Sequence, residues 1–194
     1  MPKADPKTAL ADAALKLLVK TRWDELTLAR VAKAAKIPLG ELQALAPAKP
    51  ALLGIILARF GRDTAARYKP DKGSSSARDR IFDVAMTWFD ILAPRKAAIR
   101  SLYEGLRRDP LSLIAARGEF VAAAGWLLVL AEADKGTANA IKAAGLALAL
   151  GRAIPAWLDD GKDLAKTMAS LDRDLARGES LFGFRKEEKE KGLS

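Results

Sequence analysis

The sequence predicts an all-α protein. Apolar residues recur at intervals of three and four along almost the whole chain, and no segment shows the alternation of a strand. Half of the 194 residues are apolar, with Ala and Leu dominant, a composition that suits a helical bundle with an ample core. The length fits one domain of ordinary size, or a small module joined to a larger one.

Two short helices with a tight connection are predicted near the N-terminus. They follow an amphipathic helix that runs from Thr8, its predicted cap, to Lys20. Thr27 is placed to cap the first of the pair, which ends near Ala35. Pro38 lies in the first turn of the second, where its missing N–H costs nothing, and Pro47 ends that helix. Such a pair is a helix-turn-helix, whose second helix enters a DNA major groove.

Longer helices are predicted over the rest of the chain. Their expected ranges are 50–67, 76–92, 95–107, 109–133, 137–158 and 163–177. Residues 68–76, which contain Pro, Gly and serines, form the clearest break in the chain. Lys142 and Arg152 interrupt the most apolar stretch, 138–158, so we expect it to pack inside a bundle and not to cross a membrane. Residues 185–194 are expected to be a loose charged tail.

The positive charge is concentrated toward the N-terminus. Residues 1–70 carry 13 Lys or Arg against 6 Asp or Glu, whereas the other 124 residues carry 20 against 18. The excess coincides with the helix-turn-helix and favours a polyanionic partner, nucleic acid or an acidic membrane surface, although a basic excess also serves solubility alone.

Catalytic chemistry has few candidates in this sequence. The chain contains no Cys and no His, so it lacks thiolate chemistry, the commonest general base and the commonest metal ligand. Asp159, Asp160 and Asp163 cluster between two predicted helices, where they are interpreted as caps. We therefore predict no enzyme activity, no cofactor and no metal site.

The first 67 residues resemble the N-terminal domain of TetR-type transcriptional regulators. In that family the third helix reads roughly Val-Ser-Lys-Gly-x-Leu-Tyr-x-His-Phe, followed by Ser-Lys-x-x-Leu-Leu. The matching residues are Gly40, Leu42, Lys49, Leu52 and Leu53, together with Trp23 after the first helix and Thr27 at the start of the second. The sequence departs from the pattern at positions that touch phosphate in the family, where it has Pro38, Leu39, Gln43 and Leu45.

The resemblance implies a TetR-like fold with two parts. Residues 1–48 would form the DNA-binding domain, and residues 49–194, which include a connecting helix over 50–67, would bind a ligand and dimerise. The DNA contacts would come from Thr27, Arg30, Lys33, Lys36, Leu39, Glu41, Gln43 and Lys49. Within this set the four Lys and Arg residues would contact phosphates, and Gln43 would read an adenine edge.

The same resemblance implies a ligand pocket and a dimer interface in the second part. The pocket would be lined by Trp88, Phe89, Leu92, Tyr103, Leu106, Phe120, Trp126 and Trp157, although core residues alone would show the same pattern. Gly145 and Ala149, within a run of small residues, would allow two copies to pack closely, as TetR-type proteins pair through their last two long helices. Alanines also simply favour helix.

Two segments of the second part resemble COQ9-type proteins instead. They are residues 89–100, FDILAPRKAAIR, and residues 157–173, which contain WLDD followed by DLAKTMASLDR. That family has a TetR-like fold, binds lipid or isoprenoid and assists ubiquinone biosynthesis without being a catalyst. Two functions follow as alternatives. The first is a cytoplasmic, homodimeric, ligand-responsive transcriptional regulator, most simply a repressor, that binds operator DNA and an apolar or lipid effector. The second is a lipid-binding accessory protein with a degenerate helix-turn-helix and possible peripheral membrane contact.

Overall fold

The computed structural model describes residues 5–70, 76–135 and 138–182, which are all-helical with no strand among them. The prediction of an all-α fold is therefore confirmed. The helices, in chain order, are α1 (Pro6–Leu18), α2 (Leu28–Ala35), α3 (Leu39–Leu45), α4 (Lys49–Arg67), α5 (Ala77–Leu92), a 3-10 turn η1 (Ala93–Arg95), α6 (Lys96–Arg108), α7 (Pro110–Leu130), α8 (Asn139–Asp159) and α9 (Ala165–Phe182).

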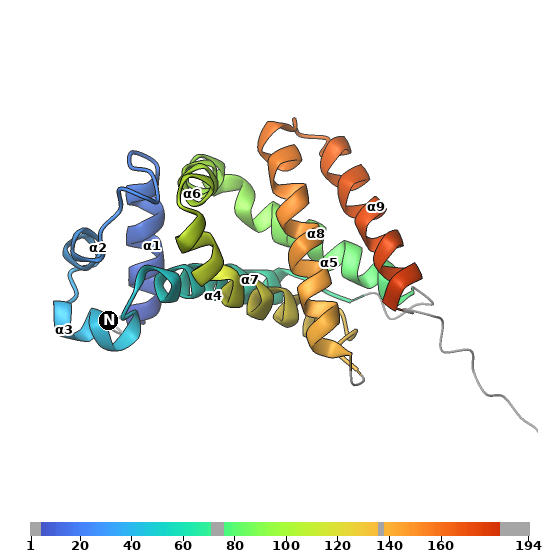
Figure 1. The fold of residues 1–194 in the computed structure, drawn as a ribbon, viewed down its shortest axis with the longest axis horizontal. Coiled ribbons are helices and arrows are strands. Elements are labelled where there is room, and N and C mark those ends of the chain that lie inside the picture. Colours follow the sequence, from blue (N-terminus) through green and yellow to red (C-terminus); the bar gives the residue numbers. More distant parts are fainter. Residues whose placement is uncertain (1–4, 71–75, 136–137, 183–194) are drawn as a thin grey trace, which may run out of the picture.

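Helices α1, α2 and α3 form a small head at one end of the molecule (Figure 1). Trp23 and Leu26, in the connection between α1 and α2, are buried together with Val31 of α2 and Leu42 of α3. Helix α4 leaves the head, packs on α1, and continues into the rest of the molecule. The head and the larger body therefore share one continuous apolar core.

The body is built around the crossing of α4 and α7 (Figure 1). Helix α5 packs on α4 and α7, and α6 lies against both α1 and α7. Helices α8 and α9 lie side by side at the end of the molecule away from the head, and α8 also packs on α7. This arrangement places α6 between the head and the α7–α8 layer.

Side-chain caps mark the starts of α1, α2, α5 and α7, and the predicted starts of α1 and α9 need correction. Ser76 and Asp79 form a reciprocal capping box at the start of α5, where the sequence predicts a helix from residue 76. Helix α1, however, is capped by Asp5, whose carboxylate accepts hydrogen bonds from the backbone N–H groups of Lys7 and Thr8; Pro6 occupies its first turn. Thr8 lies inside the helix and is not its cap.

The start of α9 is the second correction. The helix begins at Ala165, two residues later than expected, after Leu164 adopts a left-handed φ of 53°. Asp160 then accepts hydrogen bonds of 2.7 Å from both the backbone N–H and the hydroxyl of Thr167. Burial opposes ionisation of Asp160, but these bonds and nearby Lys166 outweigh it and lower the pKa of the carboxyl. The predicted start at Thr137 and the predicted tail, 185–194, lie outside the described residues.

Among the described residues, α7 and α8 are long and apolar enough to cross a membrane. Helix α8 packs between α7 and α9, as expected for a bundle helix. Helix α7 is the more apolar of the two, yet only 22% of its most apolar 18-residue window is buried. A large apolar surface thus remains open on α7.

Candidate functional site

The turn between α2 and α3 is fixed by the chain itself. Lys36 ends α2 in the left-handed conformation, with a φ of 58°. The backbone N–H of Ile37 donates to the carbonyl oxygen of Ala32 at 3.0 Å, a bond that closes a Schellman-type helix end. Glycine usually occupies this position, since a side chain there costs about 1 kcal/mol. The turn therefore presents a lysine at the corner of the helix-turn-helix.

The outer face of α3 carries little charge. Leu42 is its buried residue and holds the helix on the head. Leu39 is 61% exposed, and Glu41 and Gln43 are also exposed. No Lys or Arg lies within α3. Leu39, Glu41 and Gln43 are thus accessible to DNA, but any cationic contact to phosphate has to come from outside this helix.

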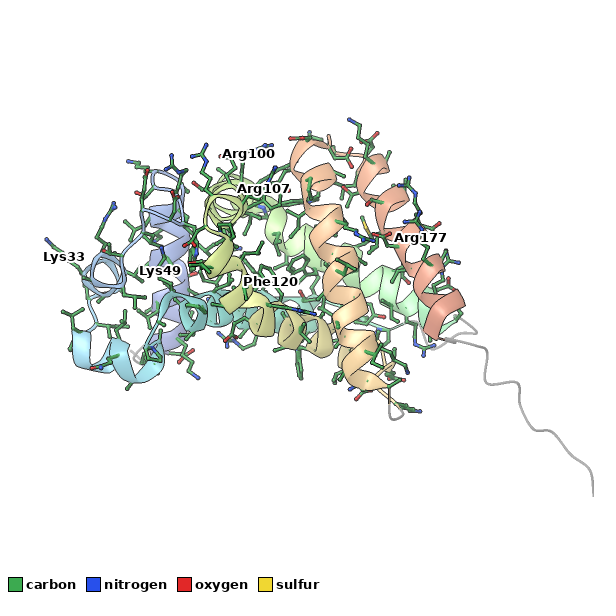
Figure 2. The ribbon with its side chains drawn as sticks, viewed as in Figure 1. Lys33, Lys49, Arg100, Arg107, Phe120 and Arg177 are labelled. Carbon is green, nitrogen blue, oxygen red and sulfur yellow. The ribbon has the colours of Figure 1, made fainter. Side chains whose placement is uncertain are left out.

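Three of the predicted phosphate contacts lie near one another in sequence and are exposed. Lys33 and Lys36 have no carboxylate within ion-pair distance among the described residues, and Figure 2 shows Lys33 at the outer edge of the head. The Arg30 guanidinium donates to the hydroxyl of Thr21 at 3.1 Å. Thr27 caps α2 through a 3.3 Å bond from the backbone N–H of Arg30, so its hydroxyl supports the helix.

Lys49 points into the molecule rather than toward solvent (Figure 2). Its ammonium donates to the carbonyl oxygens of Trp23 at 2.5 Å and Asp24 at 3.3 Å, and it lies 5.2 Å from the centroid of the Trp23 ring. Burial lowers the pKa of this ammonium below its ordinary value of 10.5, against the opposing effect of Asp109 and Asp24. The structure therefore gives Lys49 a role in holding the head on α4, in place of the predicted phosphate contact.

Replacing Lys49 with Ala is expected to destabilise the fold by about 1–3 kcal/mol, because two carbonyl oxygens lose a charged donor. Lys33→Ala, at an exposed site with no partner among the described residues, is expected to change stability by less than about 0.5 kcal/mol. Urea unfolding of both variants measures the difference. Equal stabilities for the two variants would contradict the structural role of Lys49.

The residues predicted to line one ligand pocket are divided between the core and two surface cavities. Trp88, Phe89, Leu92 and Trp157 are buried, with relative exposures of 4%, 0%, 1% and 1%. The Phe89 ring packs against the rings of Trp88 and Trp157, with centroids 5.3 and 5.7 Å apart. Their helical spacing indicates an inward face, and tertiary packing fills that face with side chains instead of a ligand.

A smaller cavity of about 310 Å³ lies where α4 meets α7. Trp126 lines it, is 45% exposed, and donates from Nε1 to the carbonyl oxygen of Gly61 at 3.2 Å. Trp88 also lines this cavity, but Trp157 does not. The three tryptophans therefore do not surround a common pocket.

The larger of these two cavities is an apolar groove of about 1030 Å³ formed by α5, α6, α7, α8 and α9. Tyr103, Leu106 and Phe120, three of the predicted pocket residues, line it. Most of its other apolar lining, such as Ile114 and Leu148, escaped the sequence prediction, which favoured aromatic residues. The available signal was the almost unbroken apolar composition of α7, because a helix that is apolar on all sides needs partners on all sides.

The predicted dimer contacts also line this groove. Ala149 is only 4% exposed because α8 is covered by its own chain there. A Cβ added to Gly145 would meet no atom within 4 Å, so that position borders open space. Ala149 is thus largely covered by its own chain and Gly145 faces the groove, and a close contact between two copies at these residues stays a prediction.

Helix α6 connects the groove with the head. Gly105 packs so closely on the head that an added Cβ would lie 2.7 Å from the backbone N of Trp23. The hydroxyl of Ser101 donates to the carbonyl oxygen of Thr21 at 3.3 Å. On the same helix, Tyr103 and Arg107 line the groove. A displacement of α6 at the groove would therefore also displace the α1–α2 connection.

Comparison with known proteins identifies the fold. A TetR transcriptional regulator from Rhodococcus sp. RHA1 superposes with a TM-score of 0.62 and 18% identity, covering 89% of this chain and 94% of that one. A TetR transcriptional regulator from Nitrosomonas europaea ATCC 19718 gives a TM-score of 0.62 and 20% identity, covering 91% and 100%. A TetR-family transcriptional regulator from Streptomyces coelicolor gives 0.50 and 20%, covering 91% and 83%.

The predicted TetR-like fold is therefore confirmed over nearly the whole chain. No protein-family model and no curated protein matches the sequence. The resemblance of residues 89–100 and 157–173 to COQ9-type proteins consequently has no support from these comparisons.

Proposed function

We propose that this chain is a cytoplasmic DNA-binding transcriptional regulator of the TetR type, in which residues 1–48 bind operator DNA and an apolar effector in the body controls that binding. The observation that carries the proposal is the exposed helix-turn-helix at one end of the molecule, with Arg30, Lys33 and Lys36 beside an uncovered α3. Gln43 is placed to read an adenine edge, and Leu39 to contact a thymine methyl group.

The regulator is proposed to act as a homodimer that reads a palindromic site. Because Ala149 is covered within its own chain, the outer face of α9 is the better candidate for the contact between copies. Met168, Ala169 and Ala176 are exposed on that helix at helical spacing. Effector control is proposed to pass through α6, since a ligand that moves Tyr103 or Arg107 also moves Gly105 against the head; such coupling is typically worth about 1–3 kcal/mol.

The proposal is tested by titrating the purified protein against the DNA upstream of its own coding sequence at several salt concentrations. In the variant Lys33→Ala with Lys36→Gly, the slope of log affinity against log salt is expected to fall by about two units. Glycine is chosen at position 36 because its left-handed φ of 58° suits glycine. Affinity for all DNA sequences should weaken alike, because phosphate contacts carry no sequence information.

A matched control replaces Lys135 and Lys162, two exposed lysines of the body, with Ala. This variant is expected to keep the wild-type salt slope. An unchanged slope in the Lys33 and Lys36 variant would remove these residues from the DNA interface. Binding of promoter DNA no tighter than non-specific DNA at low salt would overturn the regulator itself.

The second candidate function is a lipid-binding accessory protein that does not read DNA. The specific observation in its favour is that α3 lacks any cationic residue and Lys49 points inward, while the body has a large apolar groove. This function predicts lipid binding together with an absence of specific DNA binding, which the same titration measures.

A further inference from the structure

Helix α7 has an apolar surface that its own chain leaves uncovered. Its most apolar window has a mean hydropathy of 1.7, but only 22% of that window is buried. Leu113 is 44% exposed and Ile114 is 70% exposed, and both lie on the wall of the groove. A helix that is apolar on all sides is ordinarily enclosed, so this wall is suited to an apolar partner.

The groove is large enough for a long ligand. Its volume of about 1030 Å³ lies at the upper end of the range for small-molecule sites. Leu148 and Ile141 of α8 are 55% and 52% exposed and also line the groove. Figure 2 shows Arg107 on α6, Phe120 on α7 and Arg177 on α9, three of the helices that enclose it.

The charged residues of the groove are almost all positive. Among the described lining residues they are Arg107, Arg117, Lys142, Arg152 and Arg177, against one carboxylate, that of Asp174. Asp174 lies 3.6 Å from the Arg152 guanidinium and 3.5 Å from that of Arg177. The Lys142 ammonium donates to the carbonyl oxygen of Lys135 at 2.8 Å. Asp174 is thus shared by two arginines, and the described lining residues together carry a net positive charge.

Arg107 and Arg117 have no carboxylate partner among the described residues. They come from the last turns of α6 and the first half of α7, on either side of the Asp109–Pro110 junction. The Arg107 guanidinium lies 5.6 Å from the centroid of the Tyr103 ring, which also lines the groove. Two guanidinium groups without a described carboxylate partner, beside an apolar wall, suit an anion with an apolar tail.

We infer that the groove binds a single-chain amphiphile with an anionic head group, a long-chain carboxylate, with its head group at Arg107 and Arg117 and its chain along α7 and α8. This inference deepens the proposed function. Binding of the amphiphile is argued from the groove alone, and only its role as an effector rests on the proposed function. A purely apolar effector would leave both guanidinium groups without a counterion.

Charge complementarity selects this occupant over a second copy of the chain. A two-fold contact across the groove would gather the five cationic side chains of each copy at one interface, against one described carboxylate per copy, and such an excess of like charge costs affinity. A bilayer surface would meet the rim but not the concave interior. A dispersed long-chain carboxylate instead supplies both the negative charge and the apolar surface.

The test measures binding of laurate and of 1-dodecanol, which has the same chain length without the charge, to the full-length protein by calorimetry at about pH 7.5. The wild type is expected to bind laurate at least about tenfold more tightly than dodecanol, because charge-assisted hydrogen bonds form with one and not the other. Arg107→Gln with Arg117→Gln should weaken laurate binding about tenfold and leave dodecanol binding within about threefold. Arg173→Gln with Lys162→Gln, exposed residues outside the groove, is the matched charge control.

Gly145→Leu tests whether the alkyl chain of the ligand lies in the groove. Because an added Cβ at Gly145 meets nothing within 4 Å, the leucine is expected to fill the groove without disturbing the fold, and to weaken both ligands at least about tenfold. Gly118→Leu, also open to space but outside the groove lining, should bind both ligands normally.

Equal wild-type affinity for laurate and dodecanol would overturn the inference, as would full laurate affinity in either groove variant. If the protein floated with anionic phospholipid vesicles and did not bind laurate, the groove cations would be assigned to binding a membrane surface. A change of sedimenting species in Gly145→Leu without a change in laurate binding would make the groove a subunit interface. All of these measurements are made without DNA, so failure of the ligand and failure of operator binding are recorded separately.

Discussion

Trp157→Ala is expected to destabilise the protein by about 3–5 kcal/mol, the range for removal of a buried tryptophan. Trp157 is 1% exposed, its ring lies 5.7 Å from that of Phe89, and the Lys96 ammonium lies 5.3 Å from its centroid. Truncation would leave a cavity that the surrounding helices cannot close. Urea unfolding, with the slope checked for two-state behaviour, measures the loss.

Trp126→Ala is the matched control, because the sequence assigned both tryptophans to the same pocket. Trp126 is 45% exposed and contributes one hydrogen bond to the Gly61 carbonyl oxygen, so its loss is expected to cost about 1–1.5 kcal/mol. Equal destabilisation by the two substitutions would show that the two tryptophans do not differ in burial as described.

Gly105→Ala is expected to destabilise by about 1–3 kcal/mol, although alanine is the better helix former. The added Cβ would lie 2.7 Å from both the Cβ and the backbone N of Trp23, and 3.0 Å from the backbone N of Asp24. Backbone atoms cannot move aside as a flexible side chain can, so α6 would have to shift away from the head. Thermal unfolding is the measurement.

Gly118→Ala is expected to change the stability in the opposite direction, measured in the same thermal unfolding experiment. An added Cβ there meets nothing within 4 Å, so the substitution should stabilise α7 by about 0.5–1 kcal/mol through helix propensity alone. If both Gly105→Ala and Gly118→Ala stabilised the protein, α6 would not be in close contact with Trp23. The proposed coupling between the groove and the head would then lack the contact on which it depends.

The helices and their main breaks could be predicted from the sequence because their causes are local. The pairing of Ser76 with Asp79 and the cap at Thr27 act within three residues, and the spacing of Leu28 with Ala32 or of Ile56 with Phe60 marks an inward face within one helix. The first cap was misplaced because Asp5 and Thr8 are equally suitable residue types, and the choice between them lies in backbone geometry.

The candidate sites were predicted less completely, because helical spacing gives the face of a residue but not the partner of that face. The bond from Lys49 to Trp23 joins residues 26 positions apart, so a lysine that matches a DNA-binding pattern is committed to the interior. The groove cations come from α6, α7, α8 and α9, and no local pattern unites Arg107 with Arg177.

The sequence by itself determined that this protein is all-α, that a helix-turn-helix lies near its N-terminus and that its excess of positive charge lies there, because periodicity, capping and composition are properties of neighbouring residues. Only the tertiary structure decided that Trp88, Phe89 and Trp157 fill the core, while Tyr103 and Phe120 border an open, cationic groove. Burial depends on which helices cross and how closely, and that is set by contacts between residues far apart in the chain.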